Sequence, residues 1–259
     1  MKKYRLLVTV IIAMGIILIG TSNPITNIYK SSSFINRGIN PESKEKIEKD
    51  KKFLICIDPG HQEKGDSKLE PIAPGSYQQK ARVSSGATGV ATKKPEYVLN
   101  MEASTVLRHI LEGKGYSVVM TRDTNNVNIS NSERAIFANE QKADMVIRVH
   151  ADSLDNSSKT GASILIPAKD NKYTSEIYTS SNECAQLIKA DMEKCGIEIN
   201  GIFERGDLTG FNWSKVPVVL VEMGFLSNYN EDRKMSNPDY QQKLMQSVAD
   251  GVEEYFSNK

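Results

Sequence analysis

The stretch FLICIDPGHQ, residues 53–62, is an apolar run that ends in a polar turn and His61. Two later stretches have the same form. DMVIRVHADS, residues 144–153, reaches His150, and VPVVLVEMGF, residues 216–225, reaches Glu222. In an open α/β sheet, side chains just beyond the carboxyl ends of strands converge on one crevice, so these three groups are predicted to share a site. Two imidazoles and a nearby carboxylate are ligands that suit a catalytic zinc ion.

From Phe53 onward, strand-like and helix-like segments alternate, which predicts an α/β fold. The expected architecture is a single domain with a twisted, mostly parallel or mixed central sheet and helices on both faces. About 205 residues are enough to bury the core of one such domain. The formal charge of the chain is +1, with 33 basic and 32 acidic residues. This balance provides no basic surface of the kind that binds nucleic acid.

The first 22 residues have the composition of an export signal. MKKYR precedes an apolar run at residues 6–20, and small residues follow at Gly20 and Ser22. The run is shorter than the roughly 20 residues that span a bilayer, but it lacks a clean cleavage motif. A removed signal peptide and an uncleaved membrane anchor therefore both stay open. Residues 23–52 are expected to form a polar tether, and residues 53–259 a catalytic domain outside the cytoplasm.

A helix is expected to begin at Pro95, because Leu99 and Ala103 start an apolar stripe at helical spacing. On a helical wheel Glu96 falls within this stripe, so its carboxylate is expected to point toward the interior, where it needs a partner. An acid in a first turn also stabilises the positive end of the helix dipole, and the pattern supports both interpretations equally. His109 lies on the polar side of this helix and is expected to be solvated.

The segment from Pro59 to Lys94 is long, polar and rich in glycine, and it is expected to be a functional or mobile loop. Cys56 lies in the first strand pattern, whereas Cys184 and Cys195 are about 16 Å apart on one expected helix, which excludes a disulfide between them. Buried or half-buried thiols are predicted. Further strands are expected at residues 116–120, 145–149, 162–166 and 216–221, and further helices from Ser130 or Ser132, over about 175–194, and from Asn237.

Arg148 precedes His150 by two residues, so both side chains lie on one face of the expected strand, about 7 Å apart. Arg148 either holds a carboxylate of the substrate or pairs with a structural acid such as Asp58. We favour the structural pairing.

Several ordered motifs carry a resemblance to a known family. They are IDPGHQ (57–62), the E-x-x-x-N of Glu96 to Asn100, the run from TRD (121–123) to RAIFANE (134–140), RVHADS (148–153) and LTGFNWSKVPVVLVEMGFLSN (208–228). In these motifs the chain resembles the zinc-dependent N-acetylmuramoyl-L-alanine amidases of the amidase_3 family. An export signal before a bare catalytic domain further resembles the spore-cortex amidases that endospore formers use in germination.

The resemblance implies roles for four residues. His61, Glu96 and His150 would bind zinc, and Glu222 would be the catalytic acid or base. The implied reaction hydrolyses the amide bond between the lactyl group of N-acetylmuramic acid and L-alanine in peptidoglycan, which places the protein in the cell wall or spore envelope. Two features depart from the family: Gln62 replaces a common glycine, and the polar segment at 63–94 is unusually long. The long segment is expected to leave Glu96 poorly positioned without help from substrate or another protein. Both departures leave the ligands intact but bear on the affinity for the metal.

Two other functions stay open. A non-catalytic cell-wall binding or scaffold protein would keep the fold, although all four candidate groups are present. Another zinc hydrolase, such as a peptidase or a sugar deacetylase, would share the metal chemistry. A cysteine nucleophile is disfavoured, because Cys56 and Cys184 fall within regular elements with no adjacent base.

Overall fold

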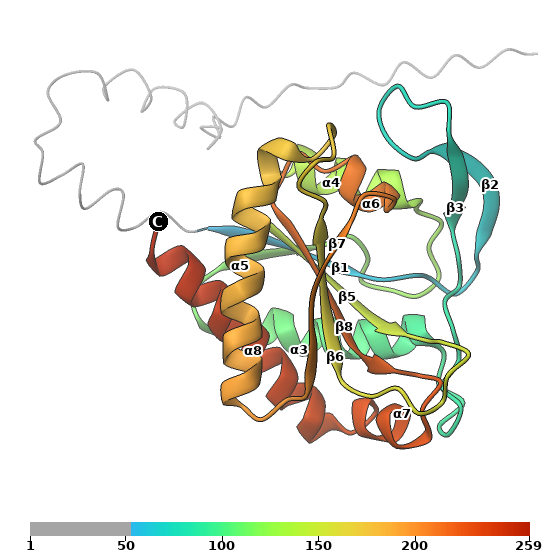
Figure 1. Cartoon of the computed structure of the whole chain (residues 1–259), viewed down its shortest axis with the longest axis vertical. Helices are drawn as coiled ribbons and strands as arrows, with labels where there is room; N and C mark the ends of the chain where they lie inside the picture. Colours follow the sequence, from blue (N-terminus) through green and yellow to red (C-terminus); the bar gives the residue numbers. More distant parts are fainter. Residues whose placement is uncertain (1–52) are drawn as a thin grey trace, which may run out of the picture. The chain divides into compact units, whose positions relative to one another are not determined.

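A six-stranded sheet forms the centre of the computed structural model, which describes residues 53–259 (Figure 1). In spatial order its strands are β4 (Ser117–Met120), β1 (Leu54–Pro59), β5 (Met145–Asp152), β8 (Val218–Phe225), β6 (Ala162–Pro167) and β7 (Ile199–Arg205). The first four are parallel to one another, whereas β6 runs antiparallel to β8 and parallel to β7. The predicted mixed, mostly parallel sheet is confirmed.

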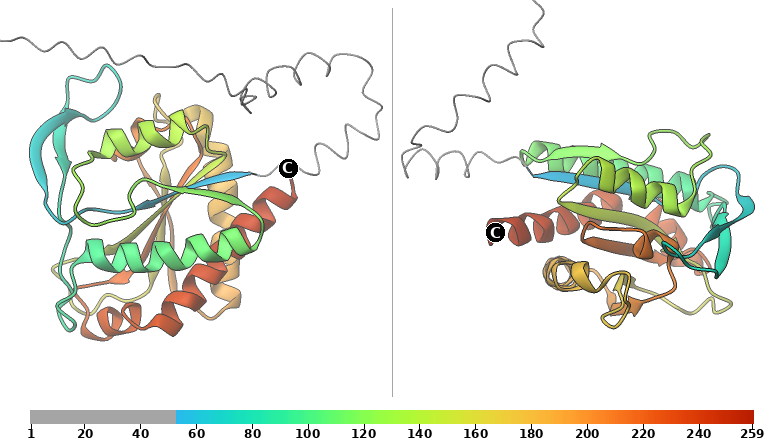
Figure 2. Two further views of the ribbon diagram at one scale, coloured as in Figure 1. Left: turned by 180° about the vertical axis from the view of Figure 1, so that it is seen from behind. Right: turned by 90° about the horizontal axis from the view of Figure 1, so that it is seen from above.

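Helices cover both faces of this sheet, as the sequence predicts (Figure 2). The larger core lies under α3 (Glu96–Gly113), α5 (Ser175–Lys194) and α8 (Pro238–Ser257), whose apolar stripes include Leu107, Ile188 and Leu244. On the other face, α4 (Asn131–Glu140) and the short α6 (Thr209–Asn212) contribute Ala138 and Phe211 to a smaller core. Ser130 caps α4 in a capping box with Glu133, which settles the choice between the two predicted caps.

The alternation of side chains along β1 assigns each residue to one of these layers. Ile55 and Ile57 belong to the larger core, whereas Cys56 belongs to the smaller one. Asp58 therefore points to the same face as Cys56, toward α4. On β8, every residue except Glu222 is buried, as expected for a strand covered on both faces.

The segment from Pro59 to Lys94 differs from the expected loop. It contains a hairpin of β2 (Asp66–Pro71) and β3 (Gln79–Val83), which form a separate antiparallel sheet. Polar contacts hold the hairpin to the domain: Arg82 pairs with Glu133 of α4 at 2.8 Å, and the Trp213 indole N–H donates to the Pro71 carbonyl at 2.9 Å. Neither strand has the apolar alternation that identifies a strand in a sequence, which explains the difference.

A short helix, α7 (Tyr229–Met235), is also absent from the predicted elements. It buries the carboxylates of Glu231 and Asp232 rather than an apolar stripe, so the periodicity does not reveal it. Asp232 accepts hydrogen bonds from the backbone of Ala91 at 2.7 Å and Thr92 at 2.8 Å, and thereby fixes the loop that leads into α3.

The three cysteines are free, with Cys56 and Cys184 buried and Cys195 half-buried, as predicted. Burial raises the pKa of the Cys56 and Cys184 thiols, which disfavours the thiolate form that a nucleophile requires. Within residues 53–259, no helix combines the length and apolar character needed to cross a bilayer. The expected signal or anchor at 1–22 and the tether at 23–52 lie outside the described residues.

Candidate metal centre and active site

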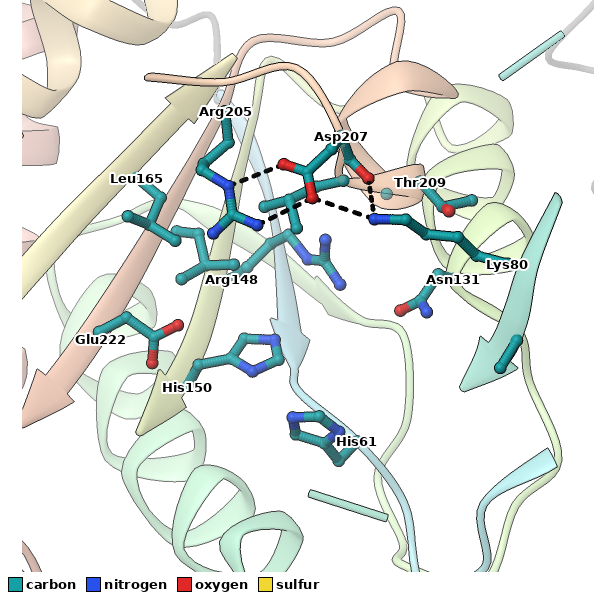
Figure 3. A pocket seen from close by; sticks show the side chains of 14 residues that line it. His61, Lys80, Asn131, Arg148, His150, Leu165, Arg205, Asp207, Thr209 and Glu222 are labelled. Atoms are coloured by element: carbon teal, nitrogen blue, oxygen red, sulfur yellow. Dashed lines mark hydrogen bonds and ion pairs between the residues drawn. The ribbon is translucent and has the colours of Figure 1, made fainter. Parts of the chain in front are cut away.

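The fold brings together three of the side chains singled out in the sequence. His61 follows β1, Glu96 is the first residue of α3, and His150 lies near the end of β5. One ligand atom from each lies within 4.8 Å of the other two. Glu96 Oε1 is 3.1 Å from His61 Nε2 and 3.2 Å from His150 Nδ1. The two imidazole rings are 4.8 Å apart between centroids and are neighbours in Figure 3.

The spacing and chemistry of these groups fit a zinc ion. Two ligands at the usual zinc distances and a tetrahedral angle are about 3.3 Å apart, close to the separations from Glu96 Oε1. Either nitrogen of His150 could be its ligand atom: Nδ1 faces Glu96, whereas Nε2 is buried without a hydrogen-bond partner among the described residues. A buried polar atom without a partner is unfavourable in a protein that binds nothing there.

The tautomer of His61 is set by its neighbour Ser84. His61 Nδ1 lies 3.0 Å from the Ser84 carbonyl and 2.9 Å from its hydroxyl. Because a carbonyl oxygen can only accept, Nδ1 donates to Ser84, and Nε2 is the ring nitrogen that faces Glu96. The backbone of His61 has φ 61°, in the left-handed region, which costs about 1–3 kcal/mol in a residue other than glycine. Strain of this kind occurs at functional sites.

The carboxylate of Glu96 is buried and ionised. Burial acts to raise its pKa, but the hydrogen bonds from His150 and His61 outweigh burial and hold the pKa below its usual range. Its second oxygen accepts a hydrogen bond from the Ala87 N–H at 3.0 Å, and Asn100 donates to the first at 3.3 Å. Glu96 therefore contacts both imidazoles and does more than complement the helix dipole. Contacts within the chain thus hold the Glu96 carboxylate in place, and the expected help from substrate or an accessory protein stays a prediction.

The imidazole of His150 is neutral at pH 7. Burial lowers its pKa to about 4, with a contribution from the charge of His61, against the opposing effect of Glu96. Neutral imidazole is the form that binds a metal ion. The ring packs directly on Gly60, where an added Cβ would lie 2.2 Å from Cε1 of His150. Only glycine leaves room for the ring.

The turn at residues 59–62 is held by two buried arginines. Arg122 donates to the carbonyls of Pro59 and Gly60, and Arg134 donates to those of Pro59 and His61, each at 2.9 Å. Three successive carbonyls are thus fixed by guanidinium groups, and with them the direction of His61.

Gln62, which departs from the family pattern, is fully buried next to this turn. Its side-chain oxygen accepts from the Ile129 N–H at 3.1 Å, and its amide donates to the Lys64 carbonyl at 2.9 Å. The amide is therefore satisfied within the fold by partners other than the three candidate ligands.

Arg148 pairs with Asp58, as predicted. Its Nε donates to Asp58 at 2.8 Å, and Arg134 donates to the other carboxylate oxygen at 2.9 Å. Burial acts to raise the pKa of Asp58, but the two guanidinium groups and Thr121 lower it well below the usual range. The buried ion triad locks β1, β5 and α4 together beneath the site.

Glu222 lies directly opposite His150 on the neighbouring parallel strand, but it is not one of the three clustered ligands. Its Oε2 is buried without a hydrogen-bond partner among the described residues. Burial, together with the charges of Glu96 and Asp152, raises the pKa of Glu222 well above its ordinary value. A carboxyl group of raised pKa is a stronger base when it is ionised, which suits proton transfer beside a metal ion. The exposed His109 plays no part in the site, as expected.

A cavity of about 260 Å³ adjoins these groups (Figure 3). His61, His150 and Glu222 line one end of it. The other end is lined by a rim bridge, in which Asp207 pairs with Lys80 of β3 at 3.0 Å and with Arg205 of β7 at 2.8 Å. Sequence reasoning missed these three residues, because Lys80 and Asp207 are 127 positions apart and no motif connects them.

The chain belongs to the Amidase_3 family, whose description is N-acetylmuramoyl-L-alanine amidase and whose model matches residues 55–254. It is 22% identical over 214 residues to an N-acetylmuramoyl-L-alanine amidase of Mycobacterium tuberculosis, covering 80% of this chain and 88% of that protein. It is 27% identical over 218 residues to the probable cell wall amidase LytH of Staphylococcus saprophyticus, covering 84% of this chain but only 62% of LytH.

Solved structures share the fold. The N-acetylmuramyl-L-alanine amidase of Mycobacterium smegmatis matches with a TM-score of 0.72 and 22% identity, over 80% of this chain and 98% of that one. The CwlD amidase from Clostridioides difficile, solved in complex with the GerS lipoprotein, matches with a TM-score of 0.63 and 22% identity, over 80% of this chain and 100% of that one.

Proposed function

We propose that this protein is a zinc-dependent N-acetylmuramoyl-L-alanine amidase that removes peptide stems from peptidoglycan. It would cleave the amide bond between the lactyl group of N-acetylmuramic acid and L-alanine. The observation that carries the proposal is the convergence of His61, Glu96 and His150, with Glu222 opposite them, in a chain of the Amidase_3 family.

In this proposal His61, Glu96 and His150 hold the metal ion. Zinc, when bound, supplies Lewis-acid chemistry that polarises a carbonyl group and makes water more acidic. Glu222 takes a proton from the attacking water and delivers it to the nitrogen of L-alanine as the amide bond breaks. Its raised pKa suits this role, because a more basic carboxylate takes the proton more readily.

We further propose where the enzyme acts and how the chain is organised. Residues 1–22 would be a signal peptide, or a membrane anchor through residues 6–20, followed by a tether at 23–52 and the catalytic domain at 53–259. The enzyme would then act outside the cytoplasm, on spore cortex, as the resemblance to cortex amidases suggests. The complex of CwlD with a lipoprotein supports the further proposal that an accessory protein binds this chain.

Digestion of purified peptidoglycan tests the reaction, the metal and the substrate together. The full chain would be incubated with vegetative and cortex sacculi, with zinc and with a chelator, and the products analysed by mass spectrometry. If the proposal is correct, the chain liberates peptides with a free L-alanine amino terminus when zinc is present and releases none with the chelator. Release of deacetylated sugars or of peptides cut elsewhere would identify another hydrolase, and no release with zinc would favour a binding or scaffold protein.

A further inference from the structure

We propose that the cavity beside the metal centre binds a free carboxylate on the second residue of the peptide stem, through Arg148 and Arg205. This inference rests on the proposed amidase function and adds which stems the enzyme selects. In peptidoglycan the L-alanine is followed by D-glutamate joined through its γ-carboxyl group, so its α-carboxyl group is either free or amidated. The free form would be preferred.

The first support is the way in which Arg148 is held. Its Nε donates to Asp58 at 2.8 Å, which fixes the plane of the guanidinium group. The terminal nitrogens have no hydrogen-bond acceptor among residues 53–259, and Arg148 lines the cavity. Gly210 makes room for them, because a Cβ there would lie 2.2 Å from Nη1. Arg148 thus satisfies the predicted structural pairing and still presents donors to a ligand.

The second support is length. From the scissile carbonyl carbon to the α-carboxyl carbon of the second stem residue, an extended chain spans two residues, about 7 Å. Arg148 lies two residues before His150 on the same face of β5, also about 7 Å away. A stem whose scissile carbonyl lies between His150 and Glu222 and that runs along β5 therefore has the length needed to bring this carboxylate to the level of Arg148.

The third support is the charge and shape of the cavity. The cavity is lined by three cationic side chains and two carboxyl groups, namely Lys80, Arg148 and Arg205 and those of Asp207 and Glu222. The two terminal nitrogens of Arg148 can donate two parallel hydrogen bonds to a carboxylate, which an amide cannot reproduce. Arg205 adds its charge and its remaining terminal nitrogen, because its Nε and Nη2 already donate to Asp207. Leu220 lies beside Arg148 in the sheet, and Leu165 lies beside Leu220, so the floor between these charges is apolar and suits the alanine methyl group.

Arg205 is the better residue for substitution. Asp207 orients it through two hydrogen bonds, of 2.8 Å to Nε and 3.0 Å to Nη2, and its side chain is 41% exposed. It can therefore be changed without leaving a buried charge. Replacing Arg148 by lysine keeps a cation next to Asp58 but removes the planar fork. Arg233→Gln provides a matched control, because Arg233 is exposed on α7 and does not line the cavity.

The experiment compares two muramoyl tripeptides that differ only in the α-carboxyl group of D-glutamate, free in one and amidated in the other. We expect the full chain with zinc to show a kcat/KM at least about tenfold higher for the free acid, the size of a charge-assisted hydrogen bond. Arg205→Gln and Arg148→Lys should move this ratio toward one, Arg205→Lys should restore part of it, and Arg233→Gln should leave it unchanged.

A second measurement does not depend on catalysis. The dissociation constants of the two corresponding free tripeptides, measured by calorimetry, should show the same preference for the acid. A ratio near one for the unmodified chain in both measurements, or a ratio that neither arginine variant alters, overturns the inference. If the acid binds preferentially but neither muramoyl tripeptide is cleaved, the carboxylate site stands and the proposed amidase function fails.

Discussion

Replacing Gly60 with alanine would show whether the turn at residues 59–62 sets the position of His150. The added Cβ would lie 2.2 Å from Cε1 and 2.3 Å from Nε2 of the imidazole. The turn cannot easily retreat, because the Gly60 N–H donates to the Val149 carbonyl at 2.9 Å and its own carbonyl accepts from Arg122 at 2.9 Å. The ring would therefore have to move by about 1.2 Å to reach an ordinary contact of 3.4 Å.

A shift of this size is large for a metal ligand, whose distances hold to within about 0.2 Å. We expect the zinc affinity to fall by about 10–100-fold, as when contacts that support a ligand are lost. This corresponds to about 1.4–2.8 kcal/mol. Overpacking should also lower the stability of the metal-free protein by about 1–3 kcal/mol.

Competition with a chromophoric chelator would measure the zinc dissociation constant, and denaturant unfolding without zinc would measure stability. Gly113→Ala is the matched control, because Gly113 lies in the last turn of α3 and a Cβ there would contact nothing within 4 Å. It should leave the zinc affinity unchanged and stabilise the helix by up to about 1 kcal/mol. A zinc affinity of Gly60→Ala equal to that of the unmodified protein would refute the reasoning.

Three further predictions follow from the site. Alanine at any of the three proposed zinc ligands should lower the zinc content measured by elemental analysis, whereas His109→Ala should not; normal zinc in a ligand variant would remove that residue from the site. Glu222→Gln should abolish turnover while zinc stays bound, and should stabilise the metal-free protein at neutral pH. Because the pKa of Glu222 is raised in the folded protein, burying this carboxyl group lowers the stability of the unmodified protein at pH values above its ordinary pKa of 4.5. The variant's gain in unfolding midpoint should therefore disappear as the pH falls toward 4.5. Asp58→Asn should destabilise the fold by about 3–5 kcal/mol, because it leaves Arg134 and Arg148 buried without their anion. Because the pKa of Asp58 is lowered in the folded protein, the stabilisation from its ionised carboxylate is present above pH 3.8 and is lost only at more acidic pH. Denaturant unfolding at neutral pH should therefore show the full difference in stability.

The strands and the candidate ligands could be predicted from the sequence because their signals are local. β5 and β8 are apolar runs of strand length, and the polar residue that follows each run lies at the same edge of a parallel sheet. The helical wheel placed Glu96 on the inner face of α3, where it is buried. The register that sets His150 against Glu222 was beyond reach, because it depends on which strands become neighbours.

The hairpin of β2 and β3 and the rim bridge could not be predicted for a different reason. Their stability comes from polar pairs between distant positions, such as Arg82 with Glu133 and Lys80 with Asp207, and single residues of these types occur throughout any surface. The long segment that the sequence marked only as an unusual loop therefore forms the outer wall of the cavity that holds the proposed substrate site.

The two arginines that grip the carbonyls of the turn at 59–62 come from the end of β4 and from α4, both well after that turn in the chain. The position of this turn therefore depends on contacts between residues that are 63 and 75 positions apart in the chain. Although neither arginine is a candidate ligand, substituting either one is expected to weaken metal binding by His61, because the turn that directs the imidazole would no longer be held.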